Sequence, residues 1–386
     1  MRIGIDIHSI GSQKGGNETY YRELIRELAE IRSVHNFLLY YTHPETGRQF
    51  PANDHFTLKR LSPAHPLLRI PFVIPRRAST DRLDLYHAQF IVPPLLKCKT
   101  VTSIFDIAYE RVPDLFHVAQ RAWLKLLVPW SAKRADHILT LSEHSKKDIV
   151  EAYGIAEDKI TVTHLAASDA FVPHNKEKSR ERLAQRYGIE GKFILYLGRL
   201  QARKNLARLV EAYALVREAG FSQTLVIAGK RDSLFEPVQA RIKELKLEEH
   251  VLLPGYVHAE DVPVFYSAAE VFVYPSLYEG FGLPVIEAMS CGVPVITSRG
   301  SSLEEVAGTA ALSIDPLDVE AIAQAIVKVL SDIELRKQLS EAGLARSKLF
   351  NYEDAARQTV AVYEQVMGAE GALKSQHSMG KALEGR

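Results

Sequence analysis

Cysteine is scarce in this chain of 386 residues, which contains only Cys98 and Cys291. Two cysteines are too few for a disulfide framework, and their spacing matches no metal-binding motif. This composition suits the reducing environment of the cytoplasm. An excess of charge of one sign is also absent, since the formal net charge is +1. Nothing in the overall charge therefore indicates nucleic acid as a partner.

Long apolar segments are missing as well. No charge-free apolar run reaches the ~18 residues that a membrane-spanning helix requires. The N-terminal stretch "MRIGIDIHSIG" is typical of a β-strand and lacks the basic start and apolar core of a signal peptide. We therefore expect a cytoplasmic protein, located either free in the cytoplasm or at the inner face of the membrane.

Two common nucleotide-binding motifs do not occur. No G-x-G-x-x-G follows a predicted strand, which disfavours a nicotinamide-dependent dehydrogenase. No G-x-x-x-x-G-K-[ST] is present either, which disfavours a P-loop NTPase. Any nucleotide that the protein binds must be held by a different set of residues.

Short apolar runs alternate with helical-period segments over almost the whole chain. This alternation predicts an α/β protein whose parallel sheets are covered by helices on both faces. The predicted strands of the first half begin at Arg2, Phe37, Asp84, Thr100 and Asp136, and those of the second half begin at Phe193, Thr224, Val251, Val271 and Val293.

The two halves of the chain begin alike. The stretches "IGIDIHSIGSQKGGNETYYRELIREL" and "FILYLGRLQARKNLARLVEAYALV" each predict a strand, a glycine-containing loop and a helix. Since a domain usually has ~100–200 residues, we expect two Rossmann-like domains, residues 1–172 and 173–350, that face each other across a cleft. We expect a C-terminal helix at 351–368 to cross back to the first domain, and the tail at 369–386 to be mobile.

Two basic residues follow the first predicted strand of the second half. Arg199 and Lys204 come after a buried strand and a glycine and precede a helix, so both can point into a cleft at the sheet edge. The arginine fork and the lysine point charge suit a diphosphate. The alternative is that both are solvated cations in a loop, and the sequence alone leaves the choice open.

Two glutamates lie eight residues apart in "YEGFGLPVIEAMSCGVPVIT". Glu279 stands among glycines, which allow close approach of the backbone to a ligand. Glu287 lies just inside a predicted helix whose free N–H groups could bind a phosphate or a sugar oxygen. Glu287 could then accept hydrogen bonds from a vicinal diol such as a ribose. The alternative is a surface loop acid and an acid favoured by the helix dipole.

Five motifs resemble, in order, those of one enzyme family. They are "GGNETYYRELIREL", "LSEHSKKDI", "GRLQARKN", "LPGYV" and "EGFGLPVIEAMSCGVPVI". The last resembles the E-x7-E signature of the retaining, nucleotide-sugar-dependent glycosyltransferases of family four, which have the GT-B fold. The resemblance covers the chain from about Arg2 to Met367 and implies two facing Rossmann-like domains with a central cleft: an N-terminal acceptor domain and a C-terminal donor domain.

The resemblance also implies a role for each motif. Arg199 and Lys204 would hold the donor diphosphate and neutralise the charge that grows on the leaving group. Glu287 would hold the ribose, and Glu279 would bind hydroxyls of the transferred sugar. Further donor contacts would come from Gly15, Gly16, Phe281, Gly282 and Leu283, and the base would lie against Gly255, Tyr256 and Val257.

The activity implied by this resemblance is transfer of a sugar, with mannose the best guess, to a glycan or a lipid-linked acceptor in cell-surface polysaccharide synthesis. The anomeric configuration would be retained. No Asp-x-Asp triplet occurs, so neither a metal nor another cofactor is implied. Two alternatives stay open: an epimerase or phosphorylase of the same fold, and a non-catalytic subunit that binds the donor.

The chain departs from the family pattern on the acceptor side. Many relatives have a histidine followed by aspartate after the fourth strand, whereas this chain has Phe105 and Asp106. We expect this position to lie across the cleft from the nucleotide. Asp106 could point into the cleft as a catalytic residue, which we favour, or cap the following loop. His87 could compensate for the missing histidine or be structural, and His164 could face the cleft.

Basic residues are interleaved with apolar ones in two segments without acids, 59–77 and 117–134. Such segments suit contact with an anionic membrane that carries a lipid-linked acceptor. The alternative is ordinary packing helices whose apolar residues face the sheet and whose charges face water.

Overall fold

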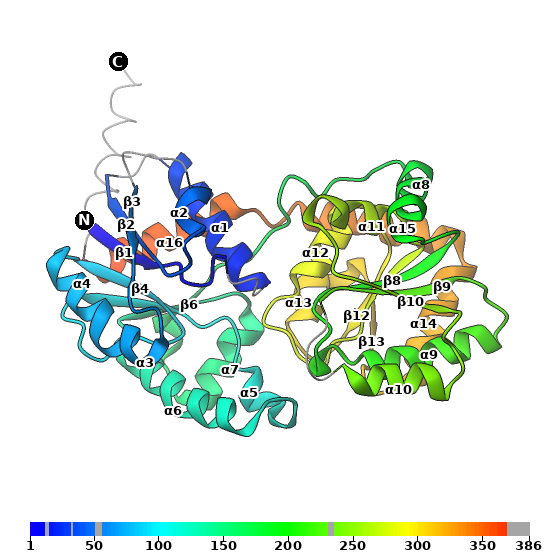
Figure 1. Ribbon diagram of the computed structural model, residues 1–386, viewed down its shortest axis with the longest axis horizontal. Coiled ribbons are helices and arrows are strands. Elements are labelled where there is room, and N and C mark those ends of the chain that lie inside the picture. Colours follow the sequence, from blue (N-terminus) through cyan, green and yellow to red (C-terminus); the bar gives the residue numbers. More distant parts are fainter. Residues whose placement is uncertain (12–14, 32–33, 51–55, 231–234, 369–386) are drawn as a thin grey trace, which may run out of the picture.

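The computed structural model describes residues 1–11, 15–31, 34–50, 56–230 and 235–368. It contains two parallel sheets, each covered by helices, which form two domains lying side by side (Figure 1). The tail at 369–386, expected to be mobile, lies outside the described residues. None of the helices in the described ranges is long and apolar enough to cross a membrane.

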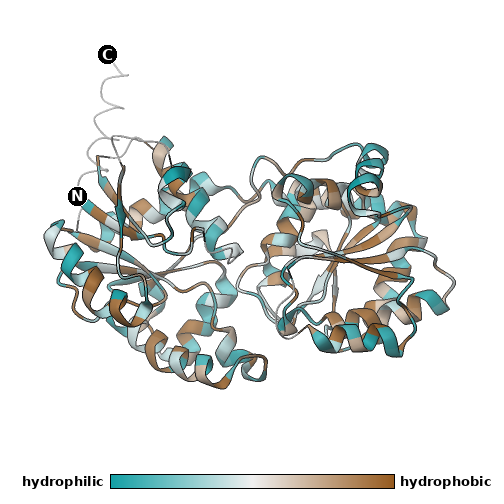
Figure 2. Cartoon of the chain, viewed as in Figure 1, coloured by the Kyte–Doolittle hydropathy of each residue, from teal (hydrophilic) through white to brown (hydrophobic). Residues whose placement is uncertain are grey.

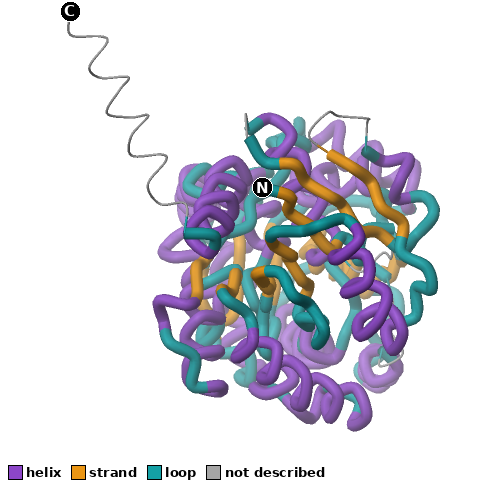
Figure 3. Tube along the Cα trace, turned by 90° about the vertical axis from the view of Figure 1, so that its left-hand side faces the viewer, coloured by secondary structure: helices purple, strands orange, loops and turns teal. Residues whose placement is uncertain are grey.

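The N-terminal domain has a seven-stranded sheet in the order β3-β2-β1-β4-β5-β6-β7. Helices lie on both sides of its strands, as Figure 3 shows with this domain toward the viewer. The strands are β1 (Arg2–Asp6), β2 (Asn36–Tyr41), β3 (Phe56–Arg60), β4 (Leu85–Gln89), β5 (Lys99–Ser103), β6 (His137–Thr140) and β7 (Ile160–Val162). The helical segments are α1 (Gly16–Glu30), α2 (Thr46–Gln49), α3 (Pro66–Leu68), η1 (Arg69–Val73), α4 (Ile74–Thr80), α5 (Ala108–Arg111), η2 (Pro113–Leu115), α6 (Val118–Arg134), α7 (Glu143–Tyr153) and η3 (Glu157–Lys159).

The C-terminal domain repeats this architecture with six strands in the order β10-β9-β8-β11-β12-β13. The strands are β8 (Phe193–Leu197), β9 (Thr224–Ala228), β10 (Val251–Gly255), β11 (Val271–Tyr274), β12 (Val295–Ser298) and β13 (Leu312–Ile314). The helical segments are α8 (Lys176–Tyr187), η4 (Ala202–Lys204), α9 (Leu206–Glu218), α10 (Glu236–Glu244), η5 (Ala259–Asp261), α11 (Val262–Ala268), α12 (Leu283–Ser290), α13 (Ser302–Ala307), η6 (Gly308–Ala310), α14 (Val319–Ser331) and α15 (Ile333–Ser347).

All ten predicted strands are present, and the predicted fold class is confirmed. The structure adds β3, β7 and β13, which lie at sheet edges. β7 and β13 have three residues each, and β3 is only partly buried. These three edge strands are short or only partly buried, so they lack the continuous apolar run by which the other ten were found, including β10 at the fourth edge.

Hydrophobic residues concentrate on the central strands, which Figure 2 shows as brown strands between helices with teal outer surfaces. β4 and β8 are buried over their whole length. Burial on both faces explains why these strands are continuous apolar runs rather than alternating ones. Both sheets therefore hold their carboxyl edges in place through packed cores.

A final helix, α16 (Tyr352–Val366), packs against α1 and β6 of the N-terminal domain (Figure 1). Tyr363 on this helix contacts His87 at the centre of the sheet, with 2.7 Å between Tyr363 Oη and His87 Nδ1. The other ring nitrogen of His87 lies 2.7 Å from Ser103 Oγ. Burial lowers the pKa of His87 to about 3, so the ring is neutral. His87 is therefore structural, and the idea that it replaces the missing cleft histidine is wrong.

Two glycines bring the ends of β8 and β9 together backbone to backbone. Gly229 has φ 141°, and a Cβ added there would lie 1.8 Å from the carbonyl oxygen of Gly198. No side chain fits in this gap. The contact fixes the start of the loop that carries Arg199.

We predict that Gly229→Ala destabilises the protein by about 3 kcal/mol or more, because the new methyl group must displace the Gly198 backbone and the residue must keep a positive φ. Urea denaturation followed by circular dichroism measures this. Gly188→Ala is the control, since Gly188 also has a positive φ (65°) but a Cβ there meets nothing within 4 Å. The control should lose only about 1–2 kcal/mol. Equal losses in the two variants would contradict the proposed close contact.

Candidate functional site

The candidate site lies at the carboxyl edge of the C-terminal sheet, where the neighbouring strands β8 and β11 end. The chain leaves β8 toward β9 on one side, and β11 lies on the other, so the strand order reverses between β8 and β11. Open α/β sheets bind ligands at such a switch point. The loop after β8 carries Arg199 and Lys204, and the loop after β11 carries Glu279.

Lys204 ends the short turn η4 and is buried, with 5% of its surface exposed. Its ammonium group donates hydrogen bonds to a carboxylate oxygen of Glu279 and to Tyr274 Oη, the latter over 2.6 Å. It also lies 4.9 Å from the centre of the Tyr274 ring. Burial and the nearby Arg203 lower the pKa of Lys204 to about 8, although Glu279 opposes them. Lys204 is therefore mostly charged at neutral pH, with Glu279 as its counter-ion.

Glu279 is the counter-ion of two cations. Its Oε2 accepts a hydrogen bond from Arg203 Nη1 (2.9 Å), and its Oε1 accepts from Lys204 and from Ser276 Oγ (2.6 Å). Burial alone would raise the pKa of Glu279, but Arg203 and Lys204 outweigh burial and lower it to about 2. Glu279 is ionised at neutral pH and can act toward a ligand only as a hydrogen-bond acceptor.

Arg203 belongs to this cluster, although sequence reasoning did not select it. Its Nη1 also donates to the carbonyl oxygen of Tyr278 (3.0 Å), so Arg203 ties the loop after β8 to the loop after β11. The only signal in the sequence is its place directly before Lys204. Successive residues of a 3-10 turn point about 120° apart, and only the fold shows that both side chains reach Glu279.

Arg199 faces the N-terminal domain. It is exposed, and its Cδ lies 3.7 Å from the position that a Cβ on Gly15 would occupy. Gly15 precedes α1 with φ 67°, a conformation that glycine adopts without strain. A Cβ on Gly16 would meet nothing within 4 Å. The predicted glycine loop of one domain thus lies beside the predicted diphosphate residue of the other.

Two further glycines shape the loop between Glu279 and Glu287. A Cβ on Gly280 would lie 2.5 Å from the carbonyl oxygen of Phe105 in the N-terminal domain. A Cβ on Gly282, whose φ is 104°, would lie 2.3 Å from Leu303 Cδ2. No side chain fits at either position, because the loop packs against the opposite domain on one side and α13 on the other. The predicted donor residues Phe281 and Leu283 are buried beside these glycines.

Glu287 lies in the second turn of α12. Tyr266 of α11 donates a hydrogen bond from its hydroxyl group to Glu287 Oε2 (3.1 Å). Burial raises the pKa of Glu287 to about 7, and the bond from Tyr266 opposes this only in part. The carboxyl group therefore changes charge near neutral pH, and further hydrogen-bond donors would favour its ionised form.

The predicted base-binding residues lie at the end of β10 and just after it, and β10 is separated from β8 by β9. The carbonyl oxygen of Gly255 accepts a hydrogen bond from the Gly229 N–H (2.7 Å). Tyr256 is 60% exposed, whereas Val257 is buried. A ligand that reached from Lys204 to Tyr256 would have to pass over the end of β9.

Asp106 follows β5 in the N-terminal domain and faces residues 275–282, the loop after β11 that contains Glu279 and other predicted donor contacts (the donor loop). Its Oδ1 accepts a hydrogen bond from the Ala108 N–H (3.0 Å), and its Cβ lies 2.8 Å from the position of a Cβ on Gly280. Asp106 therefore caps the next turn, which is one of the two alternatives, and it lies between the domains; its role as a catalytic residue stays a prediction.

Phe105 turns the other way. Its ring is 4% exposed and packs against Tyr20 and Phe90, at centroid distances of 4.7 and 5.7 Å. The backbone at this position does lie across the domain boundary, against Gly280, but the side chain points into the core and not into the cleft. The residue before Asp106 belongs to the hydrophobic core, so a change at Phe105 would test stability rather than acceptor chemistry.

The N-terminus of α7 holds the donor loop from the opposite domain. Ser142 caps this helix, and its Oγ donates a hydrogen bond to the carbonyl oxygen of Gly280 (2.8 Å). Ser145 Oγ donates to the same oxygen (3.2 Å). Both serines lie in the stretch "LSEHSKKDI", which the sequence singled out by resemblance but to which it gave no role.

Glu305 on α13 makes a second contact with the same helix. Its carboxylate accepts hydrogen bonds from the N–H groups of Glu143 and His144, each over 3.0 Å. His164 Nε2 lies 3.2 Å from Glu305 Oε1. Burial alone would raise the pKa of Glu305, but these partners together lower it. His164 thus lies between the domains and contacts Glu305.

The chemistry available here is that of an anion site. Arg199, Arg203 and Lys204 supply positive charge, and Glu279 and Glu287 supply acceptors for hydroxyl groups. Within the described ranges, no group of three His, Cys, Asp or Glu side chains is arranged to hold a metal ion. The arrangement suits a ligand that combines phosphates with hydroxyl groups.

Two family models match the chain. The model described as "Glycosyl transferases group 1" matches residues 179–346, and the model described as "Glycosyltransferase Family 4" matches residues 14–171. The O-antigen chain mannosyltransferase B of Escherichia coli is 34% identical over 363 residues, which cover 89% of this chain and 94% of that protein. The chain is thus similar to that relative over both domains.

Solved structures share the fold. The sucrose-phosphate synthase of Thermosynechococcus elongatus aligns with a TM-score of 0.77 at 22% identity, covering 96% of this chain and 100% of that one. The HepE protein of Anabaena, in complex with UDP and glucose, aligns with a TM-score of 0.75 at 16% identity, covering 95% of this chain and 100% of that one. At these identities the similarity concerns the fold alone.

We predict that Arg203→Met destabilises the protein by about 2 kcal/mol, because it removes one of the two cations that compensate the buried Glu279. Thermal unfolding at pH 7.5 measures the loss. The control is Arg357→Met, which breaks an exposed ion pair with Glu353 and should change stability by less than about 0.5 kcal/mol. If the two variants lose the same stability, Arg203 does not hold Glu279 as described.

Proposed function

Because the chain belongs to the group 1 glycosyltransferases with the GT-B fold, we propose that its donor is a nucleoside diphosphate sugar and that transfer retains the anomeric configuration. One observation carries this proposal: Arg203 and Lys204 surround Glu279 at the switch point of the C-terminal sheet, on the edge that also carries Arg199. Clustered cations in a poorly hydrated site stabilise a diphosphate and the charge that grows on it as the sugar departs.

The transferred sugar we propose is mannose, and the acceptor is a glycan or lipid-linked glycan of a cell-surface polysaccharide. Support comes from the relative of 34% identity, which is named an O-antigen chain mannosyltransferase and matches this chain over most of its length. We place this reaction in the cytoplasm, at the inner face of the membrane, with segments 59–77 and 117–134 as the contact.

The two ends of the donor would be held by different parts of the site. Glu287 would accept hydrogen bonds from the ribose, and the first N–H groups of α12 would face a phosphate or sugar oxygen. Gly255, Tyr256 and Val257 would lie against the base. The HepE complex with UDP supports a nucleotide in a protein of this fold.

Lys204 has to change partner when the donor binds. In the structure its ammonium group is held by Glu279 and Tyr274, and a donor diphosphate would compete for it. Arg203 would keep its bond to Glu279 Oε2 and so preserve the position of the carboxylate. Oε1 of Glu279 would then be available to a hydroxyl group of the sugar.

The chemical step follows from this arrangement. The bond between the anomeric carbon and the diphosphate oxygen breaks, and both electrons stay with the diphosphate. The acceptor hydroxyl attacks the anomeric carbon from the face that the diphosphate leaves, and its proton passes to the departing phosphate oxygen. Arg199 and Lys204 would stabilise the negative charge on that oxygen, which is why we propose that no metal ion is needed.

We predict that calorimetric titration with GDP, UDP, ADP and dTDP finds one nucleotide that binds with an affinity independent of magnesium. Lys204→Ala should weaken that binding by about 10–100-fold, the effect of losing a hydrogen bond to a charged group. Lys192→Ala, which removes an exposed lysine just before β8, should have no effect. Unchanged affinity in the Lys204 variant would contradict the donor site. NMR of the transfer product then tests retention, which an inverted anomeric signal would exclude.

The pH dependence of donor binding tests the role of Glu287. Its pKa of about 7 predicts that affinity for the nucleotide sugar falls by up to about tenfold per pH unit as pH drops below 7, since the protonated group loses an acceptor. The nucleotide sugar is used because its esterified diphosphate lacks the phosphate group that titrates near pH 6. Glu287→Gln should bind weakly with a flat profile between pH 6 and 7, a range in which Lys204 stays charged. A variant profile as steep as that of the wild type would assign the pH dependence to another group.

The raised pKa of Glu287 also predicts how the free energy of unfolding changes with pH. The folded-state pKa of Glu287 is raised, so its favourable contribution is fully present below the unfolded value of about 4.5 and is lost as pH rises through 7. Relative to the wild type, Glu287→Gln should therefore gain stability between pH 5 and 8, as measured by urea denaturation. A constant difference between the two proteins over this range would contradict the raised pKa.

A further inference from the structure

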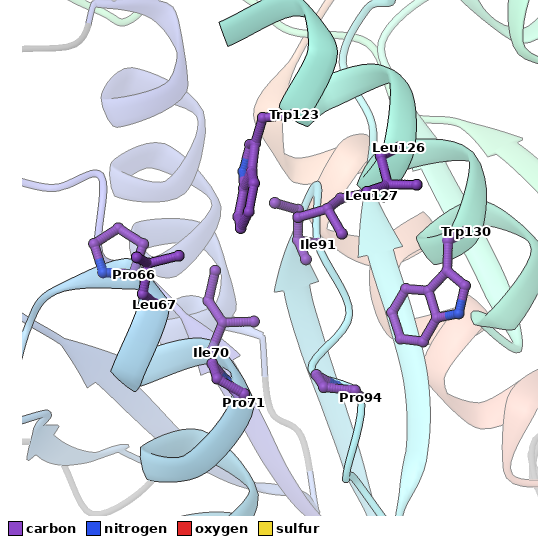
Figure 4. A pocket seen from close by; sticks show the side chains of 10 residues that line it. All are labelled: Pro66, Leu67, Ile70, Pro71, Ile91, Pro94, Trp123, Leu126, Leu127 and Trp130. Atoms are coloured by element: carbon purple, nitrogen blue, oxygen red, sulfur yellow. The ribbon is translucent and has the colours of Figure 1, made fainter. Parts of the chain in front are cut away.

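An apolar groove of about 360 Å³ opens on the surface of the N-terminal domain. In Figure 4, α3 and η1 form one wall and α6 forms the other, with the loop after β4 between them. Trp123 and Trp130 project from α6 toward this loop, which contributes Ile91 and Pro94. The remaining lining residues are Pro66, Leu67, Ile70, Pro71, Leu126 and Leu127.

More than half of the exposed large hydrophobic residues lie in or around the groove. Of the 14 large hydrophobic residues that are exposed in the described part of the chain, eight lie on these three segments. Trp123 and Trp130 are 42% and 40% exposed, and they are the only tryptophans in the sequence. The eight are Leu67, Leu68, Phe72, Leu95, Val118, Trp123, Leu126 and Trp130. Such a concentration marks an interaction site rather than ordinary surface.

The charged residues on the segments that form the groove all have one sign. Segments 56–80, 90–99 and 115–135 contain no acidic residue. Lys125 is paired with Glu110, and Arg134 lies 5.6 Å from the centre of the Trp130 ring. Six cations of these segments are exposed and form no ion pair with any described residue. They are Arg60, Arg76, Arg77, Lys97, Lys133 and Arg134. An apolar strip with cations around it and tryptophan at its rim has the composition of a membrane-interface surface.

The groove also lies near the edge of the N-terminal sheet that faces the cleft. Ile91 and Pro94 come directly after the carboxyl end of β4, and Asp106 follows the neighbouring strand β5. Phe90, with φ 59°, turns its ring back onto Phe105, so the chain beyond it leads outward to the groove. The groove therefore opens next to the strand ends at the carboxyl edge of the N-terminal sheet.

We propose that this groove is where the protein inserts into an anionic lipid bilayer. Hydrocarbon enters between α3–η1 and α6, the two tryptophans lie at the level of the headgroups, and the surrounding cations bind lipid phosphates. This proposal rests on the membrane contact included in the proposed function and adds which residues insert into the bilayer. It does not depend on the identity of the donor, because the test needs no nucleotide.

The two tryptophans make the test direct, since all tryptophan fluorescence comes from the groove. The protein is mixed with vesicles of phosphatidylcholine alone or with phosphatidylglycerol added, and in a second series the acyl chains are brominated. We expect a blue shift and quenching by brominated chains with the anionic vesicles. Binding, measured by cosedimentation, should weaken as salt is raised, because the phosphate contacts are screened.

Substitutions that leave both tryptophans in place test the groove itself. Leu67→Ser with Leu126→Ser removes two lining side chains that are 56% and 69% exposed, and vesicle affinity should fall by at least about tenfold. Arg76→Ser with Arg77→Ser should lower affinity by roughly fivefold per cation. The control is Ile333→Ser with Leu349→Ser, which changes two residues of the C-terminal domain that are 73% and 67% exposed. This control should bind as the wild type does.

Three results would overturn the proposal. The first is the absence of binding to anionic vesicles at low salt. The second is vesicle binding without quenching of tryptophan fluorescence, or a control variant that loses as much vesicle affinity as the groove variants do. Either result would place the membrane contact elsewhere. The third is a blue shift that grows with protein concentration without lipid and is abolished by the groove substitutions, which would identify a second copy of the chain as the occupant. If the protein binds nucleotide but no vesicles, the membrane proposal is wrong and the proposed donor site is unaffected.

Discussion

Glu279, Arg203 and Lys204 bring three formal charges together where little water reaches them. Each charge is tolerable there only because of the others, since an isolated buried charge is costly. The position of Glu279 depends on the loop after β11, and the positions of its partners depend on the loop after β8. The two loops are therefore held together by electrostatics as well as by the pairing of β8 with β11. In the donor complex that we propose, a diphosphate would replace a carboxylate as the partner of Lys204.

The donor loop is shaped from both sides of the cleft. Gly280 has no room for a side chain because Phe105 and Asp106 of the opposite domain lie against it. Its carbonyl oxygen is bound by Ser142 and Ser145, which belong to that same domain. The conformation at Gly280, directly after Glu279, is thus set by the two domains together.

Much of the fold followed from the sequence because the central strands are buried on both faces and must be apolar throughout. The edge strands β3, β7 and β13 were not found, since they are short or only partly buried and need no continuous apolar run. At the site, Arg199, Lys204, Glu279 and Glu287 were selected by motif and by their places after strands. Arg203 was missed because it looks like any other loop cation until η4 and the donor loop meet in space.

Two side chains considered for the cleft, those of Phe105 and His87, point elsewhere for physical reasons. Phe105 and His87 were considered for the cleft because each stands at or just beyond the end of a strand. A strand end does not decide to which side of the sheet a side chain points. Phe105 joins an aromatic cluster, and His87 finds two hydrogen-bond partners, one of them on α16, which comes at the far end of the chain. Long-range partners of this kind are not visible in local sequence patterns.

Because α16 lies on the N-terminal domain, the chain passes between the domains twice, once before α8 and once between α15 and α16. The two passages touch each other: the ring of His164 on the first lies 5.5 Å from the ring of Phe350 on the second. The two passages thus lie side by side at one place between the domains, so any movement of one domain relative to the other has to bend the chain there. Gly15 with Arg199 and Gly280 with Ser142 are both contacts between the domains, so a change at the His164–Phe350 crossing that shifted one domain would disturb both of them at once.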